Sequence, residues 1–222
     1  NHTRSGHPMN KYALIAWATR IIHLAQKDLP STKFKPGSID IAFMRKVAQF
    51  SPDKNGPKLA QNFLRDNGIA LVVERHLPRT YLDGATITLV KDHPVIGLTL
   101  RFDRIDNFWF CLMHELAHIS KHYDQGFNFF DDLEVSGLQD QLEKETDSLA
   151  GEALIPHNVW ITSPASLTPV PDAAYSLASK LGIHPAIVAG RMRRERKTYR
   201  LLSQYVGYYE VRKHFKEVSW ED

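Results

Sequence analysis

The chain has 222 residues, of which 43% are hydrophobic and 24% charged, and its formal net charge at pH 7 is +3. These values are typical of a globular protein with a substantial core, and so small a net charge does not by itself indicate binding to nucleic acid. The single cysteine, Cys111, excludes an intrachain disulfide and suits the reducing cytoplasm, where we expect the protein to act. No apolar run approaches the roughly 20 residues that span a bilayer, and we recognise no secretory signal, so we expect no membrane association.

The N-terminal part of the chain is predicted to be helical after a short tail. The chain begins at Asn1 rather than at a methionine, as expected for a tag remnant or for a fragment of a longer protein. Residues 11–27 place their apolar side chains at helical spacing. A loop with two prolines follows, and either Ser38 or Asp40 is expected to cap a second helix that ends at Phe50.

A short helix and three strands are predicted next. Residues 57–68 favour a helix that ends at a C-terminal glycine. Three apolar runs then indicate strands, and a hairpin-like turn at 91–93 joins the last two of them. The predicted strands span residues 69–73, 85–90 and 94–100.

The apolar run 108–120 contains the sequence His-Glu-Leu-Ala-His, which fits the pattern H-E-x-x-H. Residues four apart share one face of a helix, so His114 and His118 can bind the same metal ion. Glu115 lies beside them, where a carboxylate can act as general base toward water. Buried histidines need partners, and a metal ion with carboxylates supplies them, whereas a surface histidine pair fits poorly in so apolar a run.

Two histidines do not complete a catalytic zinc site, which usually has three protein ligands. The residues after His118 do not fit the extended metzincin pattern, so a carboxylate on a later helix is expected instead. A second long helix is predicted over residues 138–155, and it offers Glu143 as the third ligand, with Glu145 as the alternative. Asp147 follows Glu143 by one helical turn and can fix the tautomer of His114 as a hydrogen-bond acceptor.

The segment between the two helices and the C-terminal part of the chain leave alternatives open. The aromatic, acidic loop 124–132 is either a mobile lid over the site or a loop packed on the core, with a slight preference for the lid. Residues 178–196 have helix-turn-helix character, with Gly182 at the turn and Pro185 opening the second helix. The arginines of this segment suggest either contact with DNA or a module that packs on the rest of the protein. We favour the packing module, so DNA binding is not the expected function.

Two segments resemble the ImmA/IrrE family of metallopeptidases. The first is FWFCLMHELAH at residues 108–118, and the second is EKETDSLAGEALIP at residues 143–156. The second is similar to the family pattern E-x-E-A-N/D-x-F-A-x-x-L-L-x-P, with Thr146 and Leu149 where alanine and phenylalanine are usual. Similar domains form the protease-like half of HigA-type antitoxins, behind an Xre-type helix-turn-helix domain that residues 1–58 do not show.

The resemblance implies an α+β, zincin-like fold with a thermolysin-type core and a Zn²⁺-dependent endopeptidase activity. The implied substrate is a regulatory protein, typically a helix-turn-helix repressor in a stress, mobile-element or toxin–antitoxin circuit. On this interpretation the chain divides into three parts. They are an N-terminal tail and helices (1–58), the metallopeptidase domain (59–162) and a C-terminal helical module (163–222).

Further residues are expected to contact the substrate of such an enzyme. Strand 94–100, through Val95 and Gly97, is the candidate for holding a peptide by β-augmentation, and Tyr123 is a further candidate contact. The sequence does not choose among the side chains that could stabilise the developing oxyanion, which are Tyr123, His157, His184 and Arg104.

The alternative function is a non-catalytic antitoxin or transcriptional regulator that uses the same fold to bind a toxin or another protein. A module that only binds has no need of a general base, so the presence of Glu115 favours catalysis.

Overall fold

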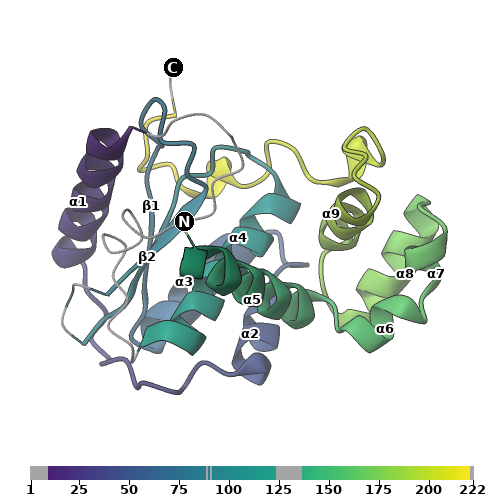
Figure 1. The fold of residues 1–222 in the computed structure, drawn as a ribbon, viewed down its shortest axis with the longest axis horizontal. Helices are drawn as coiled ribbons and strands as arrows, with labels where there is room; N and C mark the ends of the chain where they lie inside the picture. The colour runs from purple at the N-terminus through teal and green to yellow at the C-terminus, as the bar shows by residue number, and fades with distance from the viewer. Residues whose placement is uncertain (1–9, 89, 91, 124–136, 221–222) are drawn as a thin grey trace.

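The computed structural model describes residues 10–88, 90, 92–123 and 137–220, and it has the predicted α+β class with a small three-stranded sheet. Figure 1 shows this sheet beside the long helix α1, with a group of short helices at the opposite end of the molecule. Within the described residues, no helix is long and apolar enough to cross a membrane.

The sheet has the strand order β1–β3–β2. Strand β1 (Ala70–Val73) is parallel to β3 (Val95–Leu98), and β2 (Gly84–Ile87) is antiparallel to β3. The three predicted strands therefore exist, although each is shorter than predicted. The prediction that strand 94–100 holds a peptide by β-augmentation is wrong, because the backbone of β3 pairs with a neighbouring strand on both sides.

Side chains of β3 alternate between two hydrophobic clusters on the two faces of the sheet. Val95 belongs to the cluster formed with α1 (Lys11–Lys27), whereas Ile96 and Leu98 belong to the larger cluster on the other face. A Cβ atom at Gly97 would lie 2.7 Å from the Trp17 ring, so α1 packs closely against this strand. Val95 is fully buried and Gly97 faces α1, so neither residue is placed to contact a substrate.

The helices on the other face form the larger core. The Asp40 side chain caps α2 (Ile41–Ala48) by accepting the Phe43 N–H at 2.7 Å, which decides between the two predicted caps. Helix α3 (Gly56–Asp66) ends before Gly68, whose φ of +82° favours glycine as predicted. Helices α4 (Ile105–His122) and α5 (Gly137–Leu154) complete this layer and pack extensively against each other.

The C-terminal part consists of short helices that share the larger core. They are α6 (His157–Ile161), α7 (Pro164–Leu167), α8 (Pro171–Leu181), α9 (Pro185–Glu195), and the 3₁₀ helices η3 (Ser203–Tyr205) and η4 (Arg212–His214). Helices α8 and α9 lie where the sequence predicts two helices joined by a turn, with Gly182 at φ +65° in that turn and Pro185 opening α9. One hydrophobic cluster runs from Phe34 to Val218, so the three predicted segments are continuous at the core.

Two arginines of α9 and the arginine that follows the helix form hydrogen bonds within the protein. Arg191 donates to the Ile155 carbonyl at 2.6 Å, and Arg193 donates to the Tyr199 carbonyl. Arg196, which follows the helix, donates to the Leu167 carbonyl at 2.7 Å. These contacts favour the packing interpretation of this module over contact with DNA, because side chains that bind the fold are not free to reach a groove.

Gly190 sets the close approach of α9 to α4, and its replacement is expected to destabilise the fold. A Cβ atom there would lie 2.7 Å from Asp106 Cβ, whereas a Cβ atom at Gly151 in α5 meets nothing nearer than 3.6 Å. Gly190→Ala should lower the free energy of unfolding by about 1–3 kcal/mol through overpacking. Gly151→Ala, the matched control, should leave it unchanged or raise it by up to about 1 kcal/mol. Urea denaturation measures both, and equal effects would contradict this account.

Candidate metal centre

The candidate centre is built on α4, whose burial fixes the direction of its polar side chains. Leu112, Met113 and Leu116 on this helix are fully buried in the larger core. His114 is also fully buried, and Glu115 is 1% exposed. Buried polar groups of this kind require partners, which β2 and α5 provide.

Three side chains from α4 and α5 converge on one point. The Nε2 atoms of His114 and His118 lie 3.0 Å apart. The two oxygens of Glu143 lie 3.3 Å from His114 Nε2 and 3.5 Å from His118 Nε2. Tetrahedral zinc ligands at about 2.0–2.1 Å from the ion lie about 3.3 Å from one another, so the observed spacing fits such a centre. The structure thus brings the three predicted ligands together, and this group can hold a metal ion.

Asp147 orients His114 from the far side of the imidazole ring. His114 Nδ1 donates to Asp147 Oδ1 at 2.9 Å, which leaves Nε2 facing the other two ligands. Burial opposes the charged form of His114, but the hydrogen bonds to Asp147 and Glu143 and the charge of Glu115 outweigh it and raise the pKa to about 9. Burial likewise opposes ionisation of Glu143, but its contacts with the two histidines hold its pKa well below the ordinary value.

The alternative ligand Glu145 and the single cysteine, Cys111, both lie outside the centre. Glu145, the alternative third ligand, is exposed and accepts a hydrogen bond from Gln141 at 3.1 Å. Cys111 is buried in the larger core, and its sulfur accepts from the Asn107 amide at 3.5 Å. Neither belongs to the group of converging ligand atoms.

Glu115 points toward β2 and is held there by a residue that the sequence analysis missed. Thr86 Oγ1 lies 2.9 Å from Glu115 Oε2 and 3.0 Å from the Glu115 carbonyl, and can donate to either oxygen. The other carboxylate oxygen, Oε1, is buried without a hydrogen-bond partner among the described residues. A Cβ atom at Gly84 would lie 2.9 Å from this oxygen, so a glycine leaves room beside it. In the sequence, Thr86 alternates with the apolar residues Ala85 and Ile87, and this alternation places its hydroxyl on the opposite face of β2 from theirs.

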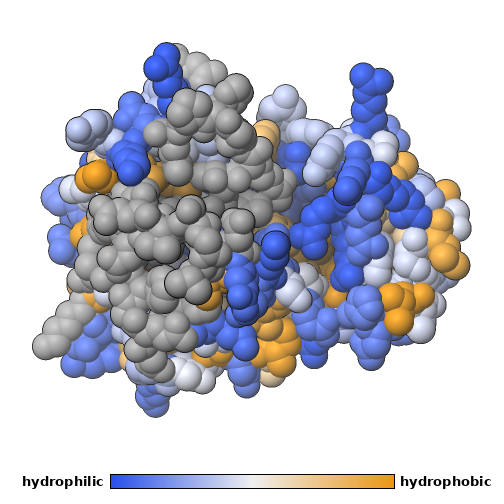
Figure 2. Space-filling model, in the orientation of Figure 1, coloured by the Kyte–Doolittle hydropathy of each residue, from blue (hydrophilic) through white to orange (hydrophobic). Residues whose placement is uncertain are grey.

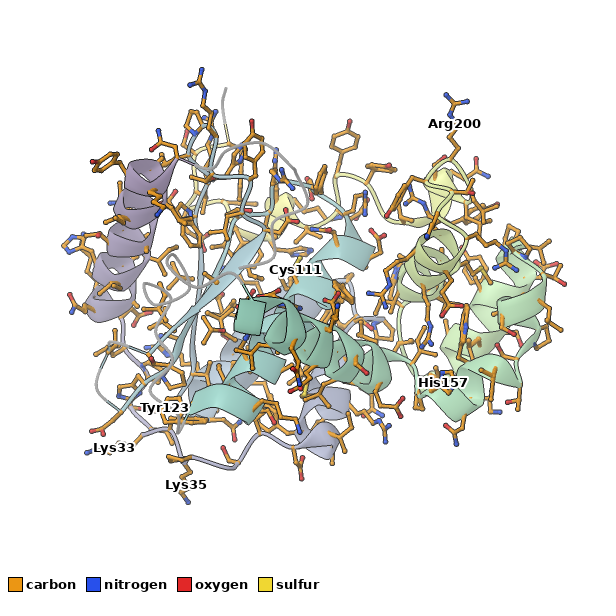
Figure 3. All side chains as sticks on the ribbon, in the orientation of Figure 1. Lys33, Lys35, Cys111, Tyr123, His157 and Arg200 are labelled. Atoms are coloured by element: carbon orange, nitrogen blue, oxygen red, sulfur yellow. The ribbon has the colours of Figure 1, made fainter. Side chains whose placement is uncertain are left out.

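The candidate oxyanion donors are dispersed over the molecule. Tyr123 follows α4 and packs edge-to-face on Phe34, with ring centroids 4.8 Å apart. In Figure 3 it lies on the opposite side of the molecule from His157, which begins α6. His184 caps α9, where its Nδ1 accepts the Ala186 N–H at 3.0 Å, and Arg104 pairs with Asp106 at 2.8 Å. The structure does not gather these four side chains at the centre.

The predicted lid over the centre, with Phe127, Phe129, Phe130, Asp131 and Asp132, lies outside the described residues.

Comparison of the chain with models of known protein families gave no match, and a search of the curated proteins also gave none. The function proposed below therefore rests on the geometry of the centre together with the sequence resemblance.

Metal binding should depend on Glu143 and not on its neighbour Glu145. Glu143→Gln removes a charged ligand, so we expect the affinity for Zn²⁺ to fall by at least about 100-fold in calorimetric titration. Glu145→Gln, an identical change two residues away on an exposed position, should leave the affinity unchanged. Equal losses in the two variants would contradict the assignment of the third ligand.

The stability of the metal-free protein should depend on pH through His114. Its pKa is raised from 6.5 to about 9, so its contribution is present below pH 6.5 and is lost as the pH rises through about 9. Thermal unfolding of protein prepared with a chelator should therefore show a falling Tm over this interval. Asp147→Asn should flatten the decline, because it removes the charge that stabilises the imidazolium; parallel curves would contradict this explanation.

Proposed function

We propose that the protein is a zinc-dependent endopeptidase that cleaves a regulatory protein, with the zincin-like core that the ImmA/IrrE resemblance implies. The observation that carries this proposal is the placement of Glu115. Its carboxylate is buried beside a three-ligand group and has one oxygen without a partner among the described residues. A site that only binds a metal for stability does not need such a group.

The ligand set supports zinc as the metal. Two imidazole nitrogens and one carboxylate suit zinc better than they suit calcium or magnesium, which prefer oxygen ligands. Three protein ligands also leave a position open, as catalytic zinc sites require. His114, His118 and Glu143 would hold the ion, and zinc bound there would act as a Lewis acid toward a water molecule and the scissile carbonyl.

Glu115 supplies the proton transfer in this proposal. Its Oε1, which has no hydrogen-bond partner in the described part of the chain, accepts a proton from the attacking water and returns it to the leaving amine as the peptide bond breaks. Thr86 limits the rotation of the carboxylate through its contact with Oε2, so that Oε1 keeps its direction. Asp147 keeps the Nδ1 proton of His114 in place, so that Nε2 stays available as a ligand.

The substrate strand is expected to pair with β2 rather than with β3. Strand β2 is at the edge of the described sheet and packs against α4. An extended peptide added to this edge would lie next to the helix that carries Glu115. By the family resemblance, the substrate is a helix-turn-helix repressor with a segment that can adopt such an extended form.

Cleavage should require the Glu115 carboxylate, while metal binding should not. We expect the zinc-loaded protein to cut a helix-turn-helix repressor encoded beside it, detected by mass spectrometry of the fragments. Glu115→Gln should lower kcat by about 10³-fold or more and retain one zinc per chain. If the wild type binds the repressor with zinc in place and never cuts it, the proposal fails and the non-catalytic alternative is supported.

Thr86 should affect the rate without affecting substrate binding. Thr86→Val removes the hydroxyl that contacts Glu115 at 2.9 Å, so kcat should fall roughly tenfold at unchanged KM. Thr162→Val makes the same change at a hydroxyl that bonds to carbonyls of its own helix α6, and should leave both constants unchanged. A change confined to KM in Thr86→Val would contradict the positioning role.

A further inference from the structure

A cavity of about 60 Å³, lined by both apolar and charged side chains, lies between α4, α5 and α9. Its walls include Asn107 and Phe110 from α4, Gly151 from α5, and Arg193 from α9. Phe110 precedes His114 by one helical turn, and their ring centroids are 6.3 Å apart. The cavity thus adjoins the candidate metal centre, although the described residues that line it include none of the three candidate ligands.

Arg193 carries a buried positive charge in the wall of this cavity. Its side chain is 3% exposed, and one of its terminal nitrogens donates to the Tyr199 carbonyl. Nε and Nη1 have no hydrogen-bond partner among the described residues. The Asp106 carboxylate lies 3.9 Å from Nη1, beyond hydrogen-bond distance.

The Asp106 carboxylate pairs with Arg104, so it does not neutralise the charge of Arg193 as well. Arg104 donates to both oxygens of Asp106, at 2.8 and 3.1 Å. A bidentate pair of this kind satisfies one carboxylate with one guanidinium. Two cations, the half-buried Arg104 and the buried Arg193, therefore share the carboxylate of Asp106, and these three side chains carry an excess of one positive charge. An isolated buried charge is strongly unfavourable, so an anion beside Arg193 would stabilise the site.

An unpartnered acceptor lies in the same wall. Asn107 is 5% exposed, and its Oδ1 atom has no partner among the described residues. Its amide nitrogen donates to the sulfur of Cys111 at 3.5 Å, and Oδ1 is the other end of the side chain. The cavity therefore offers guanidinium donors and one amide acceptor, so a complementary ligand carries an anionic group next to an N–H or O–H group.

We propose that this cavity binds a carboxylate group whose ligand also carries a neighbouring N–H, as an acidic residue of a peptide does. One unmatched positive charge fits a monoanion, and about 60 Å³ holds a group of the size of a carboxylate with its attached carbon. Two residues of the wall, Arg194 and Tyr199, are exposed, so the cavity reaches the surface. Figure 2 shows a hydrophilic surface over α9 in this region.

A carboxylate bound in this cavity can come from two sources. The carboxylate belongs either to a side chain of the protein that is bound at the metal centre, or to a free small molecule that occupies the cavity by itself. The first source rests on the proposed peptidase function, whereas the second does not. Binding is therefore measured first, on the metal-free full chain, where peptidase activity plays no part.

The binding experiment uses two isosteric probes, N-acetyl-aspartate amide and N-acetyl-asparagine amide, followed by NMR chemical shifts. The aspartate probe should bind with a Kd on the order of 1 mM, and the asparagine probe at least about tenfold more weakly. Arg193→Met should remove this preference. Arg200→Met, at a side chain that points away from the protein in Figure 3, should keep it.

A second variant covers the case in which Arg193→Met fails to fold. Asn107→Asp keeps the shape of the side chain and places a carboxylate beside Arg193, so it should abolish binding of the aspartate probe. Equal affinity of the wild type for the two probes, or no binding of either, would overturn the proposal. Binding that persists unchanged in Asn107→Asp would overturn it as well.

The source of the carboxylate is then decided by two further measurements. Acetate should bind with the same dependence on Arg193 if a free small carboxylate is the ligand. If the ligand is part of the substrate, zinc-loaded protein should cut a peptide library with a preference for Asp or Glu near the scissile bond, and Arg193→Met should lose that preference while still cutting. Carboxylate binding without any peptide cleavage would refute the peptidase function and leave this site standing.

Discussion

The hydrogen bond between His114 and Asp147 joins the two helices on which the candidate metal centre depends. It spans 2.9 Å between a fully buried imidazole on α4 and a carboxylate on α5. A buried imidazole without a partner would destabilise the core, so this bond favours one register of α4 against α5. In that register Glu143, one turn before Asp147, comes within 3.3 Å of the other ring nitrogen. The geometry of the ligands thus follows from the requirement to satisfy one buried histidine.

The C-terminal segment holds the other end of α4. The Ile105 N–H donates to the Val206 carbonyl at 3.1 Å, and the Asp103 carboxylate accepts the Val211 N–H at 2.9 Å. Arg212 reaches back to the Leu100 carbonyl at 3.0 Å. The last part of the chain therefore braces the start of the helix that carries the histidines. Together with α9, it gives the C-terminal module a structural role in the centre.

Much of the centre could be predicted from sequence because the relevant contacts are local or follow helical spacing. His114 and His118 share a helix face by their separation of four residues, and Glu143 and Asp147 do so on the next helix. The cap at Asp40 also follows from local chemistry. These features need only the sequence neighbourhood and one pairing of helices.

The features that the sequence did not predict depend on tertiary arrangement. The central position of β3 was missed because hydrophobic alternation identifies a strand but not its neighbours in the sheet. Thr86 was missed because a lone threonine in a strand is ordinary, and only the packing of β2 on α4 brings it to Glu115. Arg193 was not singled out from the other arginines of residues 178–196, and only the packing of α9 places it inside the protein, 3.9 Å from Asp106.

The proposed function requires that His114, His118 and Glu143 bind one metal ion. X-ray absorption spectroscopy of the zinc-loaded protein tests this most directly, because it reports the ligand types and distances. We predict one zinc per chain with two imidazole ligands and one carboxylate, all at about 2.0–2.2 Å, and no sulfur. A zinc–sulfur shell at about 2.3 Å, fewer than two imidazoles, or no stoichiometric zinc would contradict the assignment.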